Sequence, residues 1–288
     1  MTFKLADYEN RLVVAGGDFD LALEARGCAA VAAPELVREV AEVFLDAGAE
    51  ILVTHTAGAH ATGETCGDVE DIAPIYRRSA EICRAAADEH PSGNRRVFGA
   101  VRPPAGLFAL DEVDKDALFA AYAAEVWALK EGGVDALLCR SFTEIESLCV
   151  AVEAGAAAGL PVIAGMTFDC GPERRETTMG VTVPQACAAL VEACVVMVAC
   201  DGGESPDTLA EVVALARASC DLPVWVTLGC GLPELVEGCA VCRESPEAFA
   251  KRLPPLAQHG AAFIEVGPGA TANHVRAAVE AAKRAKRS

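Results

Sequence analysis

The chain has 288 residues, of which 52% are hydrophobic, enough to bury a sizeable core in one large α/β domain or two small ones. Its formal net charge of -18 at pH 7 would repel nucleic-acid phosphates and anionic lipid headgroups, so neither is an expected partner. No stretch approaches the roughly 18 to 20 apolar residues that cross a bilayer, and residues 1–10 lack the apolar segment of a signal peptide. These features predict a cytoplasmic protein that acts on small molecules or on other proteins.

The cysteine content agrees with that compartment. Thirteen is an odd number in a chain far larger than a disulfide-stapled miniprotein, so we expect free thiols in a reducing environment. Most of these cysteines are predicted to be small core residues.

Short apolar runs alternate with amphipathic segments along the whole chain. Runs of this length that are apolar throughout are typical of strands buried on both faces of a parallel sheet. The predicted strands are 12–14, 51–54, 97–101, 136–138, 162–167, 195–199, 224–228 and 263–266. The predicted helices include 34–47, 111–131, 143–158, 184–193, 205–219, 245–259 and 271–285.

Eight strands that alternate with helices predict a single (β/α)8 TIM barrel of the α/β class. An open doubly wound sheet is the alternative, because strand order is not visible in a sequence. No linker or low-complexity stretch divides the chain, so residues 1–288 are expected to form one domain. The long loops, 57–71 and 229–244, are expected to shape a pocket at the carboxyl ends of the strands.

Short motifs follow one another in a recognisable order from residue 16 to residue 275. Gly16-Gly17 is followed by ALEARG at 22–27, FLDAGAEILVT at 44–54, VDALL at 134–138, GLPV at 159–162, TFD at 167–169, GLPELVEG at 231–238, GAAFI at 260–264 and HV at 274–275. This series resembles the homocysteine S-methyltransferase family, which includes the betaine-dependent enzymes, almost from end to end. The resemblance implies a barrel that binds Zn²⁺ through three cysteines, holds the sulfur of homocysteine as a thiolate and presents it to a methyl donor.

The metal ligands that the resemblance implies are only partly present. The family places one cysteine after its sixth strand, which Cys200 matches, and an adjacent pair after its eighth. The pair falls on Gly267 and Pro268, which offer no ligating side chain, and one thiolate cannot complete a tetrahedral zinc site. Cys200 is equally well explained as a small apolar residue that closes a strand.

A relocated zinc site is one hypothesis for this difference. The predicted sixth and seventh strands are neighbours, so Cys200 and Cys230 would face one pocket. The C-x-x-C motif formed by Cys239 and Cys242 would then supply the missing ligands. His55 and His60, near the end of the second predicted strand, are either further ligands or acid/base groups, or hydrogen-bonded structural residues.

Two charged positions also depart from the family. Its glutamate after the fourth strand, thought to hold the substrate's amino group, is Arg140 here, which would repel an ammonium and orient an anionic group instead. At the position where the family has an acid before its glycine pair, this chain has Ala15. Asp18 is then either a replacement shifted by one residue or a solvated loop acid. We predict Asp18 and Arg140 as catalytic residues, and the predicted substrate-binding residues are Gly16, Gly17, Thr54, Ser141, Thr167 and Gly267.

Three functions follow from these observations. The resemblance favours methyl transfer to homocysteine or a related small thiol in methionine biosynthesis, with Zn²⁺ in a depleted or relocated site and a methyl donor that the sequence does not name. The second is an anion-binding barrel enzyme that uses Arg140 and the backbone amides of Gly267 to Thr271. No lysine lies near a predicted carboxyl strand end, so a Schiff-base aldolase is not expected. The third is a catalytically inactive member of the family. The oligomeric state is not predicted.

Overall fold

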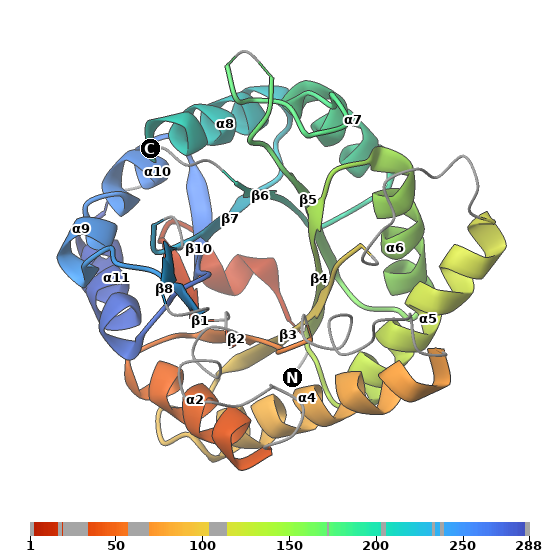
Figure 1. Ribbon diagram of the computed structural model, residues 1–288, viewed down its shortest axis with the longest axis horizontal. Coiled ribbons are helices and arrows are strands. Elements are labelled where there is room, and N and C mark those ends of the chain that lie inside the picture. The colour runs from red at the N-terminus through yellow and green to blue at the C-terminus, as the bar shows by residue number, and fades with distance from the viewer. Residues whose placement is uncertain are drawn as a thin grey trace.

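Eight parallel strands close into one barrel in the part of the chain that the computed structural model describes, which is residues 3–16, 19, 34–56, 69–103, 114–171, 173–202, 206–231, 234–236 and 239–285. The barrel strands are β1 (Val13–Gly16), β2 (Ile51–Val53), β3 (Arg96–Val101), β4 (Ala136–Phe142), β5 (Val162–Thr167), β6 (Met197–Asp201), β7 (Val224–Leu228) and β10 (Ala261–Val266). They are arranged in the order β1-β10-β7-β6-β5-β4-β3-β2 (Figure 1). This closure confirms the predicted (β/α)8 barrel and excludes the open doubly wound sheet.

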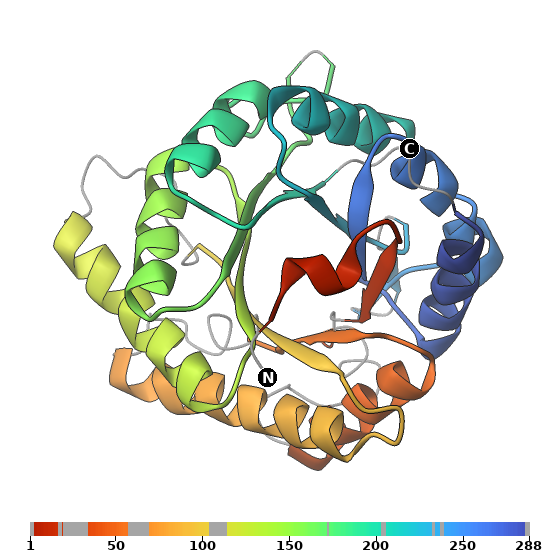
Figure 2. The same ribbon diagram turned by 180° about the vertical axis from the view of Figure 1, so that it is seen from behind.

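Helices surround the barrel on its outside (Figure 1). They are α2 (Pro34–Asp46), α4 (Val69–Glu89), α5 (Lys115–Glu131), α6 (Ile145–Ala157), α7 (Val183–Glu192), α8 (Pro206–Ser219), α9 (Pro246–Ala250), α10 (Leu253–Gln258) and α11 (Ala272–Arg284). The short 3₁₀ helix η1 (Leu5–Tyr8) lies across the end of the barrel that faces the viewer in Figure 2. None of the described helices is long and apolar enough to cross a membrane.

The helix predicted over 245–259 is in fact two helices, α9 and α10. Pro254 and Pro255 lie in the first turn of α10. Because a proline lacks the backbone N–H that a helix interior requires, a continuous helix would lose two hydrogen bonds here. A proline at the start of a new helix loses none, so the chain breaks after α9 and starts again at Leu253.

The alternation of side chains along each strand produces two apolar layers. One fills the barrel, where Trp225 packs between Phe98 and Phe263 with ring centroids 5.6 and 5.8 Å away. The other lies between the strands and the helices. On β6, Ala199 belongs to the inner layer and Cys200 to the outer one. The next residue, Asp201, therefore points to the inside of the barrel mouth.

The two long loops predicted from the sequence, 57–71 and 229–244, are described to different extents. Residues 57–68 lie outside the described part of the chain. The predicted loop 229–244 contains a small antiparallel hairpin, β8 (Glu234–Val236) and β9 (Cys239–Val241). This hairpin lies at the end of the barrel that faces the viewer in Figure 1.

Candidate active site at the carboxyl ends of the strands

Strand β4 is irregular where it reaches the mouth of the barrel. Its pairing with β5 shifts register between Cys139 and Phe142, and Ser141 has a backbone φ of 63°, in the left-handed region. A residue other than glycine pays a cost to adopt this conformation, and irregular strands of this kind are frequent beside active sites, where they redirect side chains. Here the irregularity turns both the backbone N–H and the hydroxyl of Ser141 towards Asp201.

Asp201, the last residue of β6, is the centre of a hydrogen-bond network. Its Oδ2 accepts from the backbone N and the Oγ of Ser141, at 3.1 and 3.0 Å, and its Oδ1 accepts from Thr167 Oγ1 at 2.5 Å. Only 9% of Asp201 is exposed. Burial raises the pKa of this carboxyl group, while the hydrogen bonds and the nearby charges of Arg140 and Arg102 oppose the rise. The result is a preorganised carboxyl group at the inner rim of the barrel.

Arg140 forms an ion pair with Glu265 inside the barrel. The arginine is 4% exposed and Glu265 is fully buried. Glu265 Oε1 accepts from Arg140, and Oε2 accepts from Thr227 Oγ1 at 2.8 Å and from Trp225 Nε1 at 3.3 Å. Because Glu265 balances the charge of Arg140, the reversed charge expected from the sequence does not make the site strongly cationic.

Two predicted substrate-binding residues, Thr54 and Gly16, have structural roles in the barrel. Thr54 is 1% exposed, and its Oγ1 accepts a hydrogen bond from the backbone N of Ala100 at 3.0 Å, which ties the end of β2 to β3. Gly16 ends β1, and a Cβ there would come within 3.1 Å of Phe44. Gly17 and Asp18 lie outside the described residues, so their predicted roles stay predictions.

The predicted anion-binding loop, Gly267 to Thr271, uses backbone amides for its own closure. The Gly267 N–H donates to Leu228 O at 2.9 Å and the Ala270 N–H to Gly267 O at 3.1 Å. The Thr271 N–H donates to His274 Nδ1 at 3.3 Å within the N-terminal cap of α11. Together with the paired Arg140, this geometry does not favour the anion-binding alternative.

The predicted metal ligand Cys200 does not face the barrel mouth. It is 2% exposed in the layer between the strands and the helices, where its neighbours include the thiols of Cys187 and Cys220. Burial raises the pKa of the Cys200 thiol well above its usual value. A ligand of a metal at the barrel mouth would have to point into the barrel, whereas Cys200 points towards the helices.

Two of the other predicted metal ligands do converge. A Cβ on Gly269 would lie 2.4 Å from both Cβ and Sγ of Cys242 and 3.4 Å from Cβ of Cys230. The side chain of Cys239 lies outside the described part of the structure. Among the described residues, no group of three histidine, cysteine or acidic side chains has a geometry that would hold a metal ion. The zinc that the family resemblance implies therefore does not fit the residues described.

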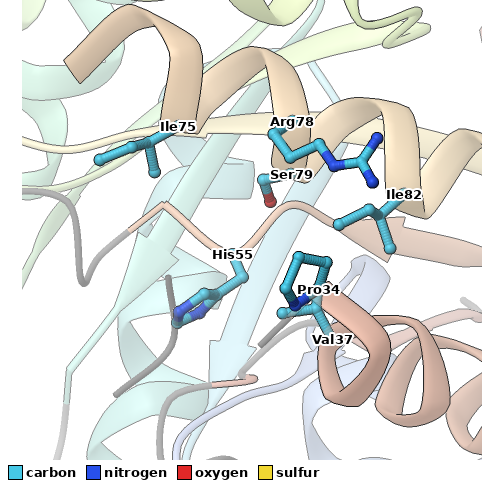
Figure 3. Close-up of a pocket in the computed structure, with 7 residues that line it drawn as sticks. All are labelled: Pro34, Val37, His55, Ile75, Arg78, Ser79 and Ile82. Carbon is cyan, nitrogen blue, oxygen red and sulfur yellow. The ribbon is translucent and has the colours of Figure 1, made fainter. Parts of the chain in front are cut away.

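His55 lies beside a small pocket of about 40 Å³ between α2 and α4 (Figure 3). Pro34 and Val37 of α2 and Ser79 of α4 line the same pocket, and the imidazole packs against Phe19 with ring centroids 6.1 Å apart. This volume suits a water molecule rather than a substrate. His60 lies outside the described residues.

The sequence interpretation identified Arg140, Ser141 and Thr167 but missed Asp201, Thr227 and Glu265. A signal for both acids was present, since each lies in or directly after an apolar strand run: Cys200-Asp201 and Ile264-Glu265-Val266. An acid in such a run is buried, and a buried acid needs partners.

A closed parallel barrel whose polar side chains gather at the carboxyl ends of its strands has the architecture of a TIM-barrel enzyme. The sequence profile of the homocysteine S-methyltransferase family matches residues 9–282, and the chain belongs to this family. The crystal structure of the homocysteine methyltransferase MmuM from Escherichia coli in its apo form is similar in fold, with a TM-score of 0.74, 21% sequence identity and coverage of 96% of this chain and 98% of that chain.

Two curated relatives match the chain over different shares of their own length. Methionine synthase of Mycobacterium leprae is 26% identical over 265 residues, which cover 87% of this chain but only 21% of that protein. The chain thus spans about a fifth of the length of this relative. Betaine–homocysteine S-methyltransferase 1 of Sus scrofa is 32% identical over 197 residues, covering 63% of this chain and 67% of that protein.

Proposed function

We propose that this protein transfers a methyl group to the sulfur of homocysteine or of a related small aminothiol. Family membership supports the reaction class, and the buried carboxyl group of Asp201 is the observation that carries the proposal for this chain. In the reaction, the substrate thiolate attacks the methyl carbon, the S–C bond forms, and the bond to the donor breaks with its electron pair leaving on the donor.

Asp201 would bind the substrate's ammonium group. The family's glutamate for this task has become Arg140, but the next residue, Ser141, donates two hydrogen bonds to Asp201. The negative charge is therefore supplied from β6 instead of β4, at nearly the same place in the barrel mouth. Asp201 Oδ1 accepts one side-chain hydrogen bond, from Thr167, and retains a lone pair for an N–H donor of the substrate.

The thiol must lose its proton before attack, because the thiolate is the nucleophile. Arg102, just after β3, and Arg140 both place positive charge near Asp201. Because Glu265 offsets the charge of Arg140, the charge of Arg102 is the one that would favour the thiolate form of a bound substrate. No step requires a metal ligand from among the described residues.

The test is a methylation assay that detects the S-methyl product by mass spectrometry. Homocysteine would be offered with betaine and with a sulfonium methyl donor. We expect turnover by the wild type and a loss of kcat/KM on the order of 100-fold in Asp201→Asn, because a neutral amide removes the charge-assisted contact. Asp221→Asn, an exposed acid between α8 and β7, is the matched control. Full activity of Asp201→Asn would rule out the role of this residue.

Two finer expectations remain part of the proposal. The first is a role in methionine biosynthesis, which follows from the product of homocysteine methylation. The second is a cytoplasmic location. Isotope tracing from a labelled methyl donor into methionine in cells that lack the gene would test the first directly.

A further inference from the structure

A cleft of about 440 Å³ lies at the amino-terminal ends of β3 and β4, at the opposite end of the barrel from Asp201. Its walls include the end of α4, Gly93 and Asn94 just after the turn that follows α4, and Asp135 before β4. This volume is within the range of small-molecule sites. A ligand in this cleft would not compete with a substrate at the barrel mouth.

The cleft gathers positive charge in a chain whose formal net charge is -18. Arg84, Arg95 and Arg96 line it, against the two carboxylates of Asp88 and Asp135. Three guanidinium groups facing two carboxylates leave an excess positive charge. Such local concentration of one charge sign attracts ligands of the opposite sign.

Asp135 fixes two of the arginines in place. Its Oδ2 lies 2.9 Å from Arg84 Nη1, and its Oδ1 lies 3.3 Å from Arg96 Nη1. Arg84 Nη2 also lies 2.8 Å from Asp88 Oδ1. The backbone N–H of Val97 donates to Asp135 Oδ2 at 2.9 Å. Both carboxylates of the cleft are thereby committed to Arg84 and Arg96.

Arg95 is different, because its side chain forms no ion pair or hydrogen bond with any residue that the structure describes. Its Nε atom is buried without a partner among those residues, as are the Nε atoms of Arg84 and Arg96, but only Arg95 also lacks a carboxylate partner for its other guanidinium nitrogens. A guanidinium carries five N–H donors, and a buried donor without an acceptor is unfavourable. An anion in the cleft would supply the negative partner that the Arg95 guanidinium lacks and that Asp135 supplies to Arg84 and Arg96.

We propose that the cleft is a binding site for a small phosphate-bearing anion, held by Arg95. The planar guanidinium fork matches two phosphate oxygens with parallel hydrogen bonds. Arg84 and Arg96, already held by Asp135, add positive potential without further ordering. Gly93 leaves open space beside the turn, since a Cβ there would have no neighbour within 4 Å. The site is independent of the methyl-transfer proposal.

The experiment measures the melting temperature of the purified protein as a function of inorganic phosphate, with ionic strength held constant by NaCl. Constant ionic strength removes general screening. Ligand that binds only the folded state raises the melting temperature with a saturating dependence. We expect this for the wild type and for the control Arg276→Gln, which changes an exposed arginine on α11. In Arg95→Gln the apparent Kd is expected to rise about tenfold or more.

Each outcome decides the proposal. Saturable stabilisation that is lost in Arg95→Gln and kept in Arg276→Gln supports it. No saturable effect in the wild type, or an equal effect in Arg95→Gln, overturns it. Malonate, a dicarboxylate, is the comparison ligand, and stabilisation by malonate equal to that by phosphate would overturn the assignment to a phosphate group. Isothermal titration of phosphate at one temperature checks Kd without unfolding the variant.

Discussion

Arg140 and Glu265 are 125 positions apart in the chain and form an ion pair inside the barrel, where neither side chain is more than 4% exposed. The pair joins β4 to β10 across the barrel, and Thr227 and Trp225 complete the hydrogen bonding of the carboxylate. Two charges that are each unfavourable alone in an apolar interior are tolerated together. This pairing also sets the charge of the mouth that a substrate meets.

Breaking this ion pair is expected to destabilise the protein strongly. Arg140→Met leaves a buried carboxylate without its cation, so the free energy of unfolding should fall by about 3 to 5 kcal/mol. The double variant Arg140→Met with Glu265→Leu should recover much of this loss. Urea unfolding of the three proteins measures both effects. The exposed Arg11–Glu50 pair is the control, because Arg11→Met should cost only about 0 to 1 kcal/mol. Equal costs for Arg11→Met and Arg140→Met would contradict the importance of burial.

The dependence of kcat/KM on pH should report the ionisation of Asp201. Binding of an ammonium requires the carboxylate form, so kcat/KM should rise as pH rises through the pKa of Asp201. Because burial raises this pKa above 3.8, the acid limb should have its midpoint above that value. In Asp201→Asn the limb should disappear. An unchanged limb in that variant would assign it to another group.

Stability should depend on pH through Glu125, a 5% exposed acid in the interior between α4 and α5. Burial raises the pKa of Glu125 from 4.5 to about 8, although a hydrogen bond from Tyr76 opposes the rise. The folded state therefore holds a proton that the unfolded state has lost. Stability from this group is present below 4.5 and is lost as pH rises to about 8, by about 1.4 kcal/mol per pH unit.

Glu125→Gln should remove this slope. The amide keeps a hydrogen-bonding group near Tyr76 but does not ionise, so the variant should be more stable than the wild type at the upper end of the window. Urea unfolding across the pH range from 4.5 to about 8 measures the difference. Parallel slopes for the two proteins would show that Glu125 does not titrate in this range.

The described residues alone are not expected to hold zinc, so zinc in protein purified without chelator would need a ligand from elsewhere in the chain. The described residues offer no group of three ligands, and Cys200 faces the helices instead of the barrel mouth. Metal analysis by mass spectrometry, before and after dialysis against Zn²⁺, makes the measurement. Stoichiometric zinc that is lost in Cys230→Ser and Cys242→Ser, but not in Cys83→Ser, would instead establish a relocated site. Cys83 is a suitable control because it is a fully buried core cysteine.

Local patterns were sufficient to predict the barrel. Each apolar run of about five residues becomes a strand because a segment buried on both faces has to be apolar throughout. The predicted strand 162–167 and the predicted strand 224–228 match β5 and β7 to the residue. No bounds were predicted for helix α4, and Pro74 within it weakens the helical pattern.

The candidate site could be predicted only in part, because its members come from separate strands. Arg140 and Ser141 were predicted as site residues because they follow the fourth predicted strand. No local pattern shows that a register shift turns Ser141 towards Asp201. The direction of Cys200 was also undecided, since a shift of one residue along a strand moves a side chain to the other face.

The sequence by itself determined the architecture, the family and the strand ends where polar residues gather, because these follow from periodicity and composition over short stretches. The tertiary structure alone decided that Arg140 meets Glu265, that Cys200 lies among helices, and that Arg95 lines a cleft at the far end of the barrel. Pairing across a closed barrel depends on strand order and register, and a carboxylate's role depends on the charges and donors brought to within about 3 Å of it.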